Sequence, residues 1–371
     1  MYIYAVKSLA FLLYPFSLIY GFIMAVRNFL YDSGMKKSKD FPVRTICVGN
    51  LSVGGTGKTP HIEYLIRLLK DDLKIATLSR GYGRKTSGYL LANENSNSLE
   101  IGDEPRQYKT KYPSILVAVD ANRARGIDNL YNQFRDLDLI LLDDAFQHRQ
   151  VKPELSIVLT DYSKMYYDDF ALPSGTLREF KSAIKRADVV IITKSPRNLS
   201  PYDRRNLEIN IGPKSWQKVF FSHIKYLNFI GINSTAKAQL PPEEVKSNQT
   251  SVLIFSGIAN SSPLEDYIRT LTTKVTKVDF SDHHQYSESD IARIIKNYEL
   301  LEGSNKIIVT TEKDFARLDK VELINKFENI PLYYAPIEIE FSEKDKEEFN
   351  QIINTYARRN KIYVGVYKEK S

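Results

Sequence analysis

The chain has 371 residues, which is enough for two domains that each have a hydrophobic core. Hydrophobic residues make up 43% of the sequence and charged residues 26%, a balance that excludes a disordered chain and one embedded entirely in a membrane. The formal net charge of +7 suits nucleic acid, an anionic membrane surface or a phosphorylated substrate, but the sequence has no zinc-ligand spacing or RNA-binding signature, so we expect no nucleic-acid partner.

The first segment with a clear character is apolar. Residues 8–26 carry no charge, are flanked by basic residues and approach the roughly 20 residues of a bilayer crossing. Pro15 and Gly21 interrupt the run, so it predicts either a spanning helix or a tilted, interfacial one; a buried core helix is the alternative. A secretory signal peptide is not expected, because it would export the nucleotide motif described below. We assign residues 1–33 to a membrane-associating helix.

Residues 34–228 alternate between apolar runs rich in β-branched residues and helix-like stretches. The predicted strands are 43–48, 74–78, 114–119, 138–142, 155–160 and 188–193, and the predicted helices include 59–70, 122–134 and 178–186. This alternation predicts an α/β fold, with a mostly parallel sheet covered on both faces and a ligand at the carboxyl ends of its strands. The only cysteine, Cys47, cannot form an intramolecular disulfide, which favours a cytoplasmic location.

A smaller α/β unit is predicted to follow. Residues 230–250 are polar, contain a Pro-Pro pair and lack a clear period, so we expect a linker there. Beyond it, the predicted strands are 252–256, 274–280 and 306–310, and the predicted helices are 263–271, 287–301 and 343–358. The core domain is therefore assigned to 34–228 and the C-terminal domain to 229–371.

The sequence NLSVGGTGKTP at 50–60 lies between the first predicted strand and the first predicted helix, as in a P-loop NTPase core. Its glycines permit backbone conformations that direct N–H groups at phosphate oxygens, and the start of the helix adds its positive dipole end. Lys58 would reach the β- and γ-phosphates, and the Thr59 hydroxyl would bind Mg²⁺. A glycine-rich turn without a ligand is the alternative. The predicted ATP-binding residues are Ser52, which stands where the usual pattern has glycine, Val53, Gly54, Gly55, Thr56, Gly57, Lys58 and Thr59.

Two further segments supply charged groups for a phosphate site. The predicted strand in DLILLDD ends in Asp143 and Asp144, which could hold Mg²⁺ beside Thr59 or cap a helix instead. LPSGTLRE supplies Arg178 and Glu179, an arginine to neutralise the transferring phosphate and a glutamate to complete the metal site. The alternative for this pair is a surface ion pair at a helix start.

Transfer of phosphate to a hydroxyl requires a carboxylate or an imidazole within reach of the attacking oxygen. GDEPRQY at 102–108 offers Asp103, and DHH at 282–284 offers His283. Each also has a structural alternative, Asp103 as a helix N-cap and His283 as a solvated loop residue.

Taken in order, the motifs VGNLSVGGTGKTP, SRGYGR, GDEP, DDAFQHR, LPSGTLRE, FSDHH and TEKD resemble those of the tetraacyldisaccharide 4'-kinase family. The resemblance covers most of the chain; residues 205–250 and roughly the last 50 contribute no motif. It implies ATP- and Mg²⁺-dependent phosphorylation of the 4'-hydroxyl of tetraacyldisaccharide 1-phosphate, which gives lipid IVA. It also implies a location at the cytoplasmic face of the inner membrane, anchored by the N-terminal helix. We expect a monomer.

The resemblance also implies roles for individual residues. Lys58 and Arg178 would lie beside the transferred phosphate, and Asp103 and His283 would form a catalytic dyad. His284 remains an alternative to His283. The implied metal ligands are Thr59, Asp143, Asp144 and Glu179.

Two motifs keep open roles. Arg80, Arg84 and Lys85 of SRGYGRK could hold the 1-phosphate of the substrate or line the nucleotide. TEKD, from Thr311 to Asp314, could contact the base or ribose, or cap a helix.

The main alternative function is a P-loop switch protein, such as a GTPase-like or metal-insertion factor. ITKSP at 192–196 resembles the guanine-reading element of GTPases, but Pro196 replaces its aspartate, so no carboxylate is visible to select guanine. An ATPase that delivers cargo at the membrane is disfavoured by Val53, where that class has a lysine.

Overall fold

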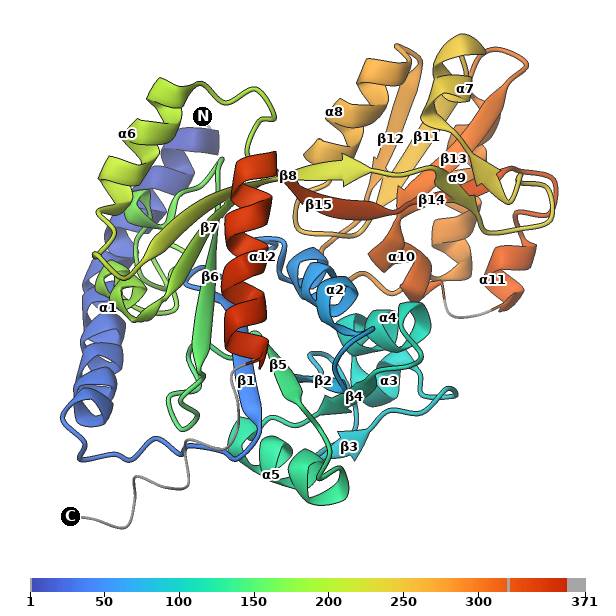
Figure 1. Cartoon of the computed structure of the whole chain (residues 1–371). Coiled ribbons are helices and arrows are strands. Elements are labelled where there is room, and N and C mark those ends of the chain that lie inside the picture. The colour runs from blue at the N-terminus through green and yellow to red at the C-terminus, as the bar shows by residue number, and fades with distance from the viewer. Residues whose placement is uncertain (1, 319–320, 359–371) are drawn as a thin grey trace. The chain divides into compact units, whose positions relative to one another are not determined.

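The computed structural model describes residues 2–318 and 321–358 (Figure 1). The described chain divides into two compact units: the first runs to Ile224 and resumes at Ile339, and the second is Lys225–Glu338. The second unit is thus inserted into the first. The predicted boundary near residue 228 is close to the first crossing, but the prediction that the second domain continues to the C-terminus differs from this division. Residues 359–371 of that predicted domain lie outside the described residues.

The N-terminal helix, α1 (Tyr2–Asp32), contains the predicted membrane-associating segment. It continues as one helix through Pro15 and Gly21, the two residues that interrupt the apolar run in the sequence. Gly21 packs directly on the ring of Phe180, where a Cβ atom would come within 2.3 Å of ring carbons. The stretch Leu12–Asp32 is long and apolar enough to cross a membrane, judged by length and composition alone. Its exposed apolar side chains include Leu12, Phe16, Leu18, Ile19, Phe22, Ile23 and Phe29.

The first unit is built on a sheet whose strand order in the described chain is β15-β8-β7-β6-β1-β5-β2-β4-β3. The parallel strands are β1 (Arg44–Asn50), β2 (Ile75–Ser79), β4 (Leu116–Val119), β5 (Leu139–Asp143), β6 (Leu155–Asp161), β7 (Val189–Thr193) and β8 (Lys218–Tyr226), and β3 (Leu90–Leu91) is antiparallel to β4. Every residue of β1 is buried between β5 and β6, as expected for a central strand with both faces covered. The predicted parallel core is confirmed.

Helices pack on both faces of this sheet. One face carries α2 (Lys58–Leu69), α4 (Asp103–Lys111) and α12 (Glu343–Arg358), and the short α3 (Ser98–Ile101) directly precedes α4. The other face carries α5 (Arg123–Gln133), α6 (Pro201–Ile211) and a 3₁₀ segment, Lys181–Arg186. The helix predicted over 178–186 is thus shorter than expected, because the backbone N–H of Arg178 bonds instead to the Leu51 carbonyl.

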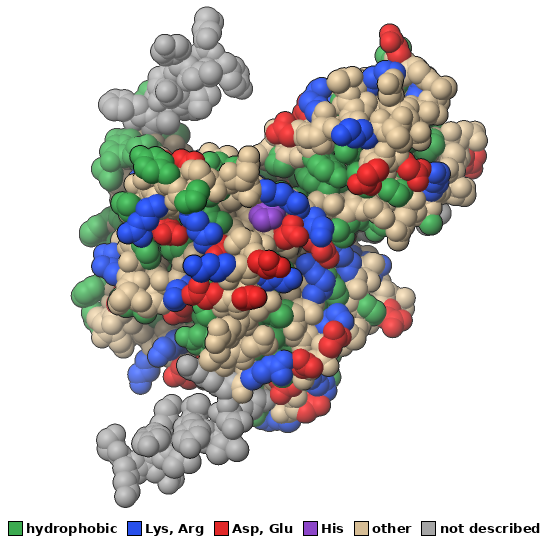
Figure 2. All heavy atoms as spheres, turned by 45° about the horizontal axis from the view of Figure 1, so that its top comes forward, with side chains coloured by type: hydrophobic (Ala, Val, Ile, Leu, Met, Phe, Trp, Pro, Cys, Tyr) green, Lys and Arg blue, Asp and Glu red, His purple; other side chains and the backbone are tan. Residues whose placement is uncertain are grey.

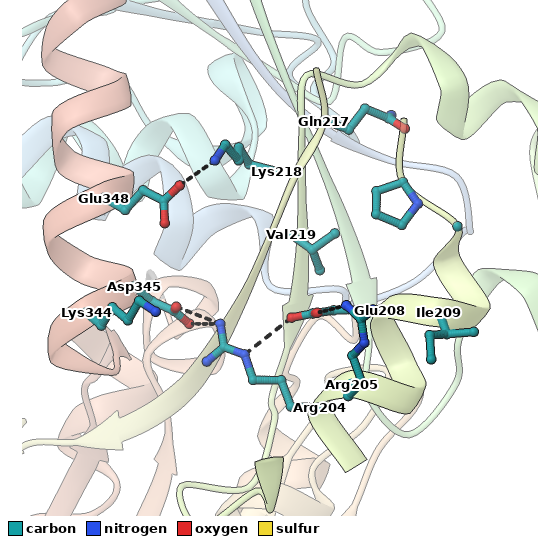
Figure 3. A pocket seen from close by; sticks show the side chains of 12 residues that line it. Arg204, Arg205, Glu208, Ile209, Gln217, Lys218, Val219, Lys344, Asp345 and Glu348 are labelled. Atoms are coloured by element: carbon teal, nitrogen blue, oxygen red, sulfur yellow. Dashed lines mark hydrogen bonds and ion pairs between the residues drawn. The ribbon is translucent and has the colours of Figure 1, made fainter. Parts of the chain in front are cut away.

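The end of the described chain returns to the first unit through β15 (Ile337–Phe341) and α12. Strand β15 pairs with β8, and Phe349 of α12 is buried in the sheet core. Figure 3 shows that the ion pair between Arg204 and Asp345, at 2.6 Å, joins α6 to α12. These residues line a groove of about 700 Å³ whose opposite charges largely pair with one another, so we assign it a structural role.

The second unit contains a smaller sheet in the order β10-β9-β14-β13-β11-β12. Strands β11 (Ser251–Ser256), β12 (Val275–Asp279), β13 (Lys306–Thr311) and β14 (Leu332–Ala335) are parallel, and β9 (Phe229–Gly231) and β10 (Gln239–Leu240) form antiparallel pairs. Its helices are α7 (Pro242–Ser247), α8 (Ser262–Leu271), α9 (Glu288–Glu299), α10 (Glu312–Arg317) and α11 (Val321–Asn325). The predicted linker at 230–250 was wrong, because it folds into β9, β10 and α7.

Charged side chains are spread over the surface of the first unit. Figure 2 shows basic and acidic side chains intermixed on the visible face of the larger body. Several form ion pairs, such as Lys39 with Asp128 at 2.6 Å and Arg197 with Glu340 at 2.7 Å. Exposed pairs of this kind contribute only about 0–1 kcal/mol each. The net positive charge therefore does not gather into one patch on that face.

Candidate active site

The loop between β1 and α2 has the backbone conformation of a phosphate-binding turn. Gly54 and Gly57 have φ values of 110° and 86°, a region that side chains other than glycine rarely adopt. The Asn50 side chain donates to the Thr56 hydroxyl at 2.8 Å inside this turn. The loop also borders the LPSGTLRE segment, because the Val53 N–H bonds to the Thr176 carbonyl. The predicted order of strand, glycine-rich loop and helix is confirmed.

Two side chains hold carbonyl groups of the loop from outside. Lys194, which follows β7 in the ITKSP motif, donates to the Gly55 carbonyl at 2.7 Å and to Asp161 at 2.6 Å. The ring Nδ1 of His61 lies 2.7 Å from the Gly57 carbonyl, so Nδ1 carries the proton and Nε2 accepts from the Ser222 hydroxyl. Because these two carbonyls accept hydrogen bonds from the protein, the remaining backbone N–H groups of the loop are available to a phosphate.

Asp143 ends β5 with a buried carboxylate. One oxygen, Oδ2, accepts a hydrogen bond of 3.0 Å from the Tyr108 hydroxyl of α4. The other, Oδ1, has no hydrogen-bond partner among the described residues. Burial, followed by the negative charge of Glu104, raises the pKa of Asp143 to about 6. An unpartnered buried carboxylate oxygen with a raised pKa is the state expected of a group that awaits a cation.

The neighbouring Asp144 lies among cations. It adopts a φ of 49°, and its Oδ1 accepts from Arg178 at 2.7 Å and lies 3.7 Å from Nζ of Lys58. Burial alone would raise the pKa of Asp144, but Lys58 and Arg178 together hold it below its ordinary value. The structure therefore brings together three of the predicted site residues, Lys58, Asp144 and Arg178.

Glu179 points away from this group. Its fully buried carboxylate pairs with the Arg186 guanidinium through both oxygens, at 2.8 and 3.0 Å, and also accepts from Asn28 of α1 at 2.5 Å. Both oxygens are thus occupied by protein donors. The geometry gives no support to the prediction that Glu179 is a metal ligand; these contacts connect α1 to the segment that carries Arg178.

Asp103 is the first residue of α4, but Gly102 occupies the N-cap position and no side chain caps the helix, so the structure does not support the alternative that Asp103 is an N-cap. Gly102 before it has a φ of 93°, and an added Cβ atom would lie 2.9 Å from the Tyr82 carbonyl, so the GDEP turn requires glycine. The next residue, Glu104, acts on the pKa values of Asp143 and Tyr108. The turn therefore directs a second carboxylate toward the end of β5.

The two adjacent histidines of the second unit differ in their surroundings. His284 bonds through Nε2 to Asp290 at 3.0 Å and stacks on the ring of Phe280. His283 has a φ of 59°, is partly exposed, and contacts Arg317 through Nδ1 at 3.1 Å. His284 is thus held by Asp290 of α9 and by Phe280, and His283 is the better candidate for a catalytic role.

The basic residues of SRGYGRK separate into different roles. Arg84 donates to the Gly88 carbonyl at 2.6 Å, which closes its own loop. Arg80 is exposed at the end of β2, and its charge contributes to the low pKa of His148, about 4, after burial and Arg123. The backbone of Lys85 bonds to the Leu99 carbonyl. The side chains of Arg80 and Lys85 are both exposed, so these two residues remain the candidates for binding an anion.

A family model described as tetraacyldisaccharide-1-P 4'-kinase matches residues 9–358. The chain belongs to this family. It is similar to tetraacyldisaccharide 4'-kinases of Bacteroides thetaiotaomicron, at 43% identity over 94% of this chain and 93% of the relative, and of Flavobacterium johnsoniae, at 43% over 94% and 97%. Its fold is similar to the crystal structure of LpxK from Aquifex aeolicus in complex with ATP, with a TM-score of 0.71 and 29% identity over 94% of this chain and 99% of that chain.

The donors beside the phosphate loop fit Mg²⁺, the cation expected in a tetraacyldisaccharide 4'-kinase. Among the residues that the structure describes, no three His, Cys, Asp or Glu side chains form a closed metal cluster. Mg²⁺ usually takes one or two carboxylates and completes its shell with phosphate oxygens and water. Asp143, with its unpartnered oxygen, Asp144 and the buried Thr59 supply such an incomplete set.

Sequence reasoning for this kinase family missed Glu104, Lys194 and Arg317. Glu104 had a signal, because it follows Asp103 in GDEP, but only Asp103 was assigned. Lys194 lies in ITKSP, whose only sequence signal is a resemblance to a guanine-reading element without its aspartate, whereas in the structure Lys194 contacts the phosphate loop. Arg317 lies outside every motif and carried no signal of its own.

Proposed function

We propose that the chain is a kinase that transfers the γ-phosphate of ATP to the 4'-hydroxyl of tetraacyldisaccharide 1-phosphate, which yields the bis-phosphorylated lipid A precursor. The observation that carries this proposal is the convergence of Lys58 and Arg178 on Asp144, directly beside the phosphate loop. Membership of the tetraacyldisaccharide-1-P 4'-kinase family supports the choice of acceptor.

In this proposal, residues 52–59 bind the phosphates of ATP through backbone N–H groups and the N-terminus of α2. Lys58 and Arg178 neutralise the charge that spreads over the γ-phosphate during transfer. Their contacts with Asp144 hold both cations in place before the nucleotide arrives. Mg²⁺, held by Thr59, Asp143 and Asp144, would supply further neutralisation of phosphate charge when bound.

Asp103 is proposed as the acceptor of the proton from the 4'-hydroxyl, with His283 assisting the same step. The deprotonated oxygen attacks the γ-phosphorus, the bond to the β,γ-bridging oxygen breaks, and ADP leaves with the electron pair. Support for Asp103 comes from its place at the start of α4, next to Glu104, whose charge reaches Asp143. Support for His283 comes from its exposed loop position and its contact with Arg317.

We further propose that α1 associates a monomeric enzyme with the cytoplasmic face of the inner membrane. The helix exposes a row of large apolar side chains, yet its other side is fixed to the first unit. The Tyr20 hydroxyl donates to the Arg178 carbonyl at 3.0 Å, and Arg27 donates to the Gln147 carbonyl at 2.8 Å. A helix that touches both lipid and the Arg178 segment would place the site near the acceptor's membrane.

The test is transfer of labelled γ-phosphate from ATP to extracted tetraacyldisaccharide 1-phosphate, with and without Mg²⁺. We expect a labelled lipid product with the purified protein and none with the Lys58→Ala variant. Hydrolysis of GTP with no labelled lipid would contradict the kinase and favour a switch protein.

A further inference from the structure

The loop that carries His283 folds around the peptide of Gly257, which follows β11. The backbone N–H of His283 donates to the Gly257 carbonyl at 3.0 Å, and the Gly257 N–H donates to Asp314 at 3.0 Å. A Cβ atom on Gly257 would lie 3.0 Å from the Cβ of His284 and 3.3 Å from Asp314, so the residue has little room for a side chain. Gly257 thus links the histidine loop to α10.

On the other side of this peptide lies a buried ion pair of α10. The fully buried Asp314 lies 3.4 Å from Nη1 of Arg317, whose side chain is 1% exposed. Asp314 also accepts from the hydroxyls of Tyr286, at 2.9 Å, and Thr311, at 2.6 Å. Buried charges require this degree of hydrogen bonding. Asp314 therefore fixes the Arg317 guanidinium in one orientation.

In that orientation, the guanidinium contacts the His283 loop at two points. Its Nη1 donates to the Gly257 carbonyl at 2.7 Å, and its Nη2 lies 3.1 Å from Nδ1 of His283. A guanidinium has donors and no acceptor, so Nδ1 of His283 must accept this hydrogen bond and cannot carry a proton. The ring proton of His283 then belongs to Nε2. That atom lies 4.0 Å from the Asp282 carboxylate, which favours a proton there.

We propose that Arg317, fixed by Asp314, is a positioning residue for the kinase reaction: it holds the His283 imidazole in the tautomer that carries its ring proton on Nε2. This inference rests on the proposed function, because it assumes that His283 serves phosphoryl transfer. It makes His283 a hydrogen-bond donor, and it leaves proton acceptance to the carboxylate of Asp103. It also gives TEKD a role: Thr311 caps α10, and Asp314 orients Arg317.

The first variant is Arg317→Lys. It keeps a positive charge opposite Asp314, but lysine lacks the planar pair of nitrogens that contacts the Gly257 carbonyl and His283 Nδ1 together. We expect kcat to fall about 10- to 100-fold, while KM for ATP changes by less than about twofold. The matched control is Arg204→Met, which breaks an arginine–aspartate pair outside the candidate site. Circular dichroism shows whether each variant is folded. A double variant, Arg317→Met with Asp314→Asn, removes both buried charges together and avoids an unpaired one.

A double-mutant cycle separates positioning from general structural support. In a His283→Ala background, Arg317→Lys should cost no further activity, because the ring that it positions is absent. Nitrogen NMR of protein labelled at its five histidines, with His283 assigned from the His283→Ala spectrum, reports which ring nitrogen is protonated. We expect an unprotonated Nδ1 in the unsubstituted protein and a mixture of both tautomers in Arg317→Lys.

An Nδ1-protonated His283, an unchanged kcat in the folded variant, or an equal loss in the His283→Ala background would overturn the proposal. If the unsubstituted protein transfers no phosphate to the disaccharide lipid, the proposed function fails instead. The NMR result then still decides whether Arg317 sets the tautomer.

Discussion

Nζ of Lys58 lies 3.7 Å from Oδ1 of Asp144, the same oxygen that accepts the hydrogen bond of Arg178. Lys58→Ala should therefore lower phosphate transfer at least about 100-fold and weaken ATP binding, because the transition-state charge loses a fixed cation. Calorimetric titration with an ATP analogue checks the binding. Lys218→Ala, which removes a lysine paired with Glu348 at 2.8 Å, is the control. Unchanged ATP affinity in Lys58→Ala would mean that the loop does not hold the nucleotide.

Glu179 offers a test between structural and metal-binding roles. Because its carboxylate is buried against Arg186 and Asn28, Glu179→Gln should destabilise the fold by about 3–5 kcal/mol. The concentration of Mg²⁺ that gives half-maximal activity should stay the same in this variant and rise in Asp144→Asn. Chemical denaturation and a magnesium titration check the two effects. A Mg²⁺ requirement that rises in Glu179→Gln would restore its assignment as a metal ligand.

Acidification should loosen the phosphate loop through His61. Burial lowers the pKa of His61 from 6.5 to about 4, so between these values the unfolded chain binds more protons than the folded one. The stability contributed by neutral His61 is complete above pH 6.5 and is lost as the pH falls toward 4, by up to about 3 kcal/mol.

Thermal unfolding from pH 7.5 to pH 4.5 checks this expectation against His61→Gln, which should show a shallower decline. His148, whose pKa is also lowered to about 4, is present in both proteins and does not affect the difference. Parallel declines would show that His61 does not carry this pH dependence.

Lys194→Met tests whether ITKSP reads the base or supports the loop. Since Lys194 donates to the Gly55 carbonyl, its loss should weaken ATP and GTP binding to the same degree, by roughly 10-fold for one charged hydrogen bond. Competition binding of the two nucleotides provides the measurement. A change in the ratio of the two affinities would instead assign Lys194 to base recognition.

Features that depend on local sequence were predictable. The phosphate loop follows from glycines placed between a buried strand and a helix, and Asp143 and Asp144 follow from their place after an apolar run. The parallel sheet also follows, because strand and helix alternate along residues 43–193. In each case neighbouring residues carry the whole signal.

Features that depend on distant pairing were not predictable. Strand β15 joins the first sheet by pairing with β8. Its own residues do not indicate whether it belongs to the first sheet or to the second. The partners of Glu179 are another example, because Asn28 lies about 150 positions earlier in the chain. Arg317 of α10 contacts His283, which lies 34 positions earlier in the loop before α9, and a short linear motif cannot express such a contact. Tertiary contacts decided each outcome.

The insertion of the second unit has a consequence for biosynthesis. Strand β8 leads out of the first sheet, and its partner β15 is made only after Lys225–Glu338 has been translated. Until then, one edge of the first sheet exposes unpaired N–H and C=O groups, which can recruit strands of other chains. A ribosome that stalls within the insert would therefore release a nascent chain in which β8 lacks its native partner and is open to pairing with other chains.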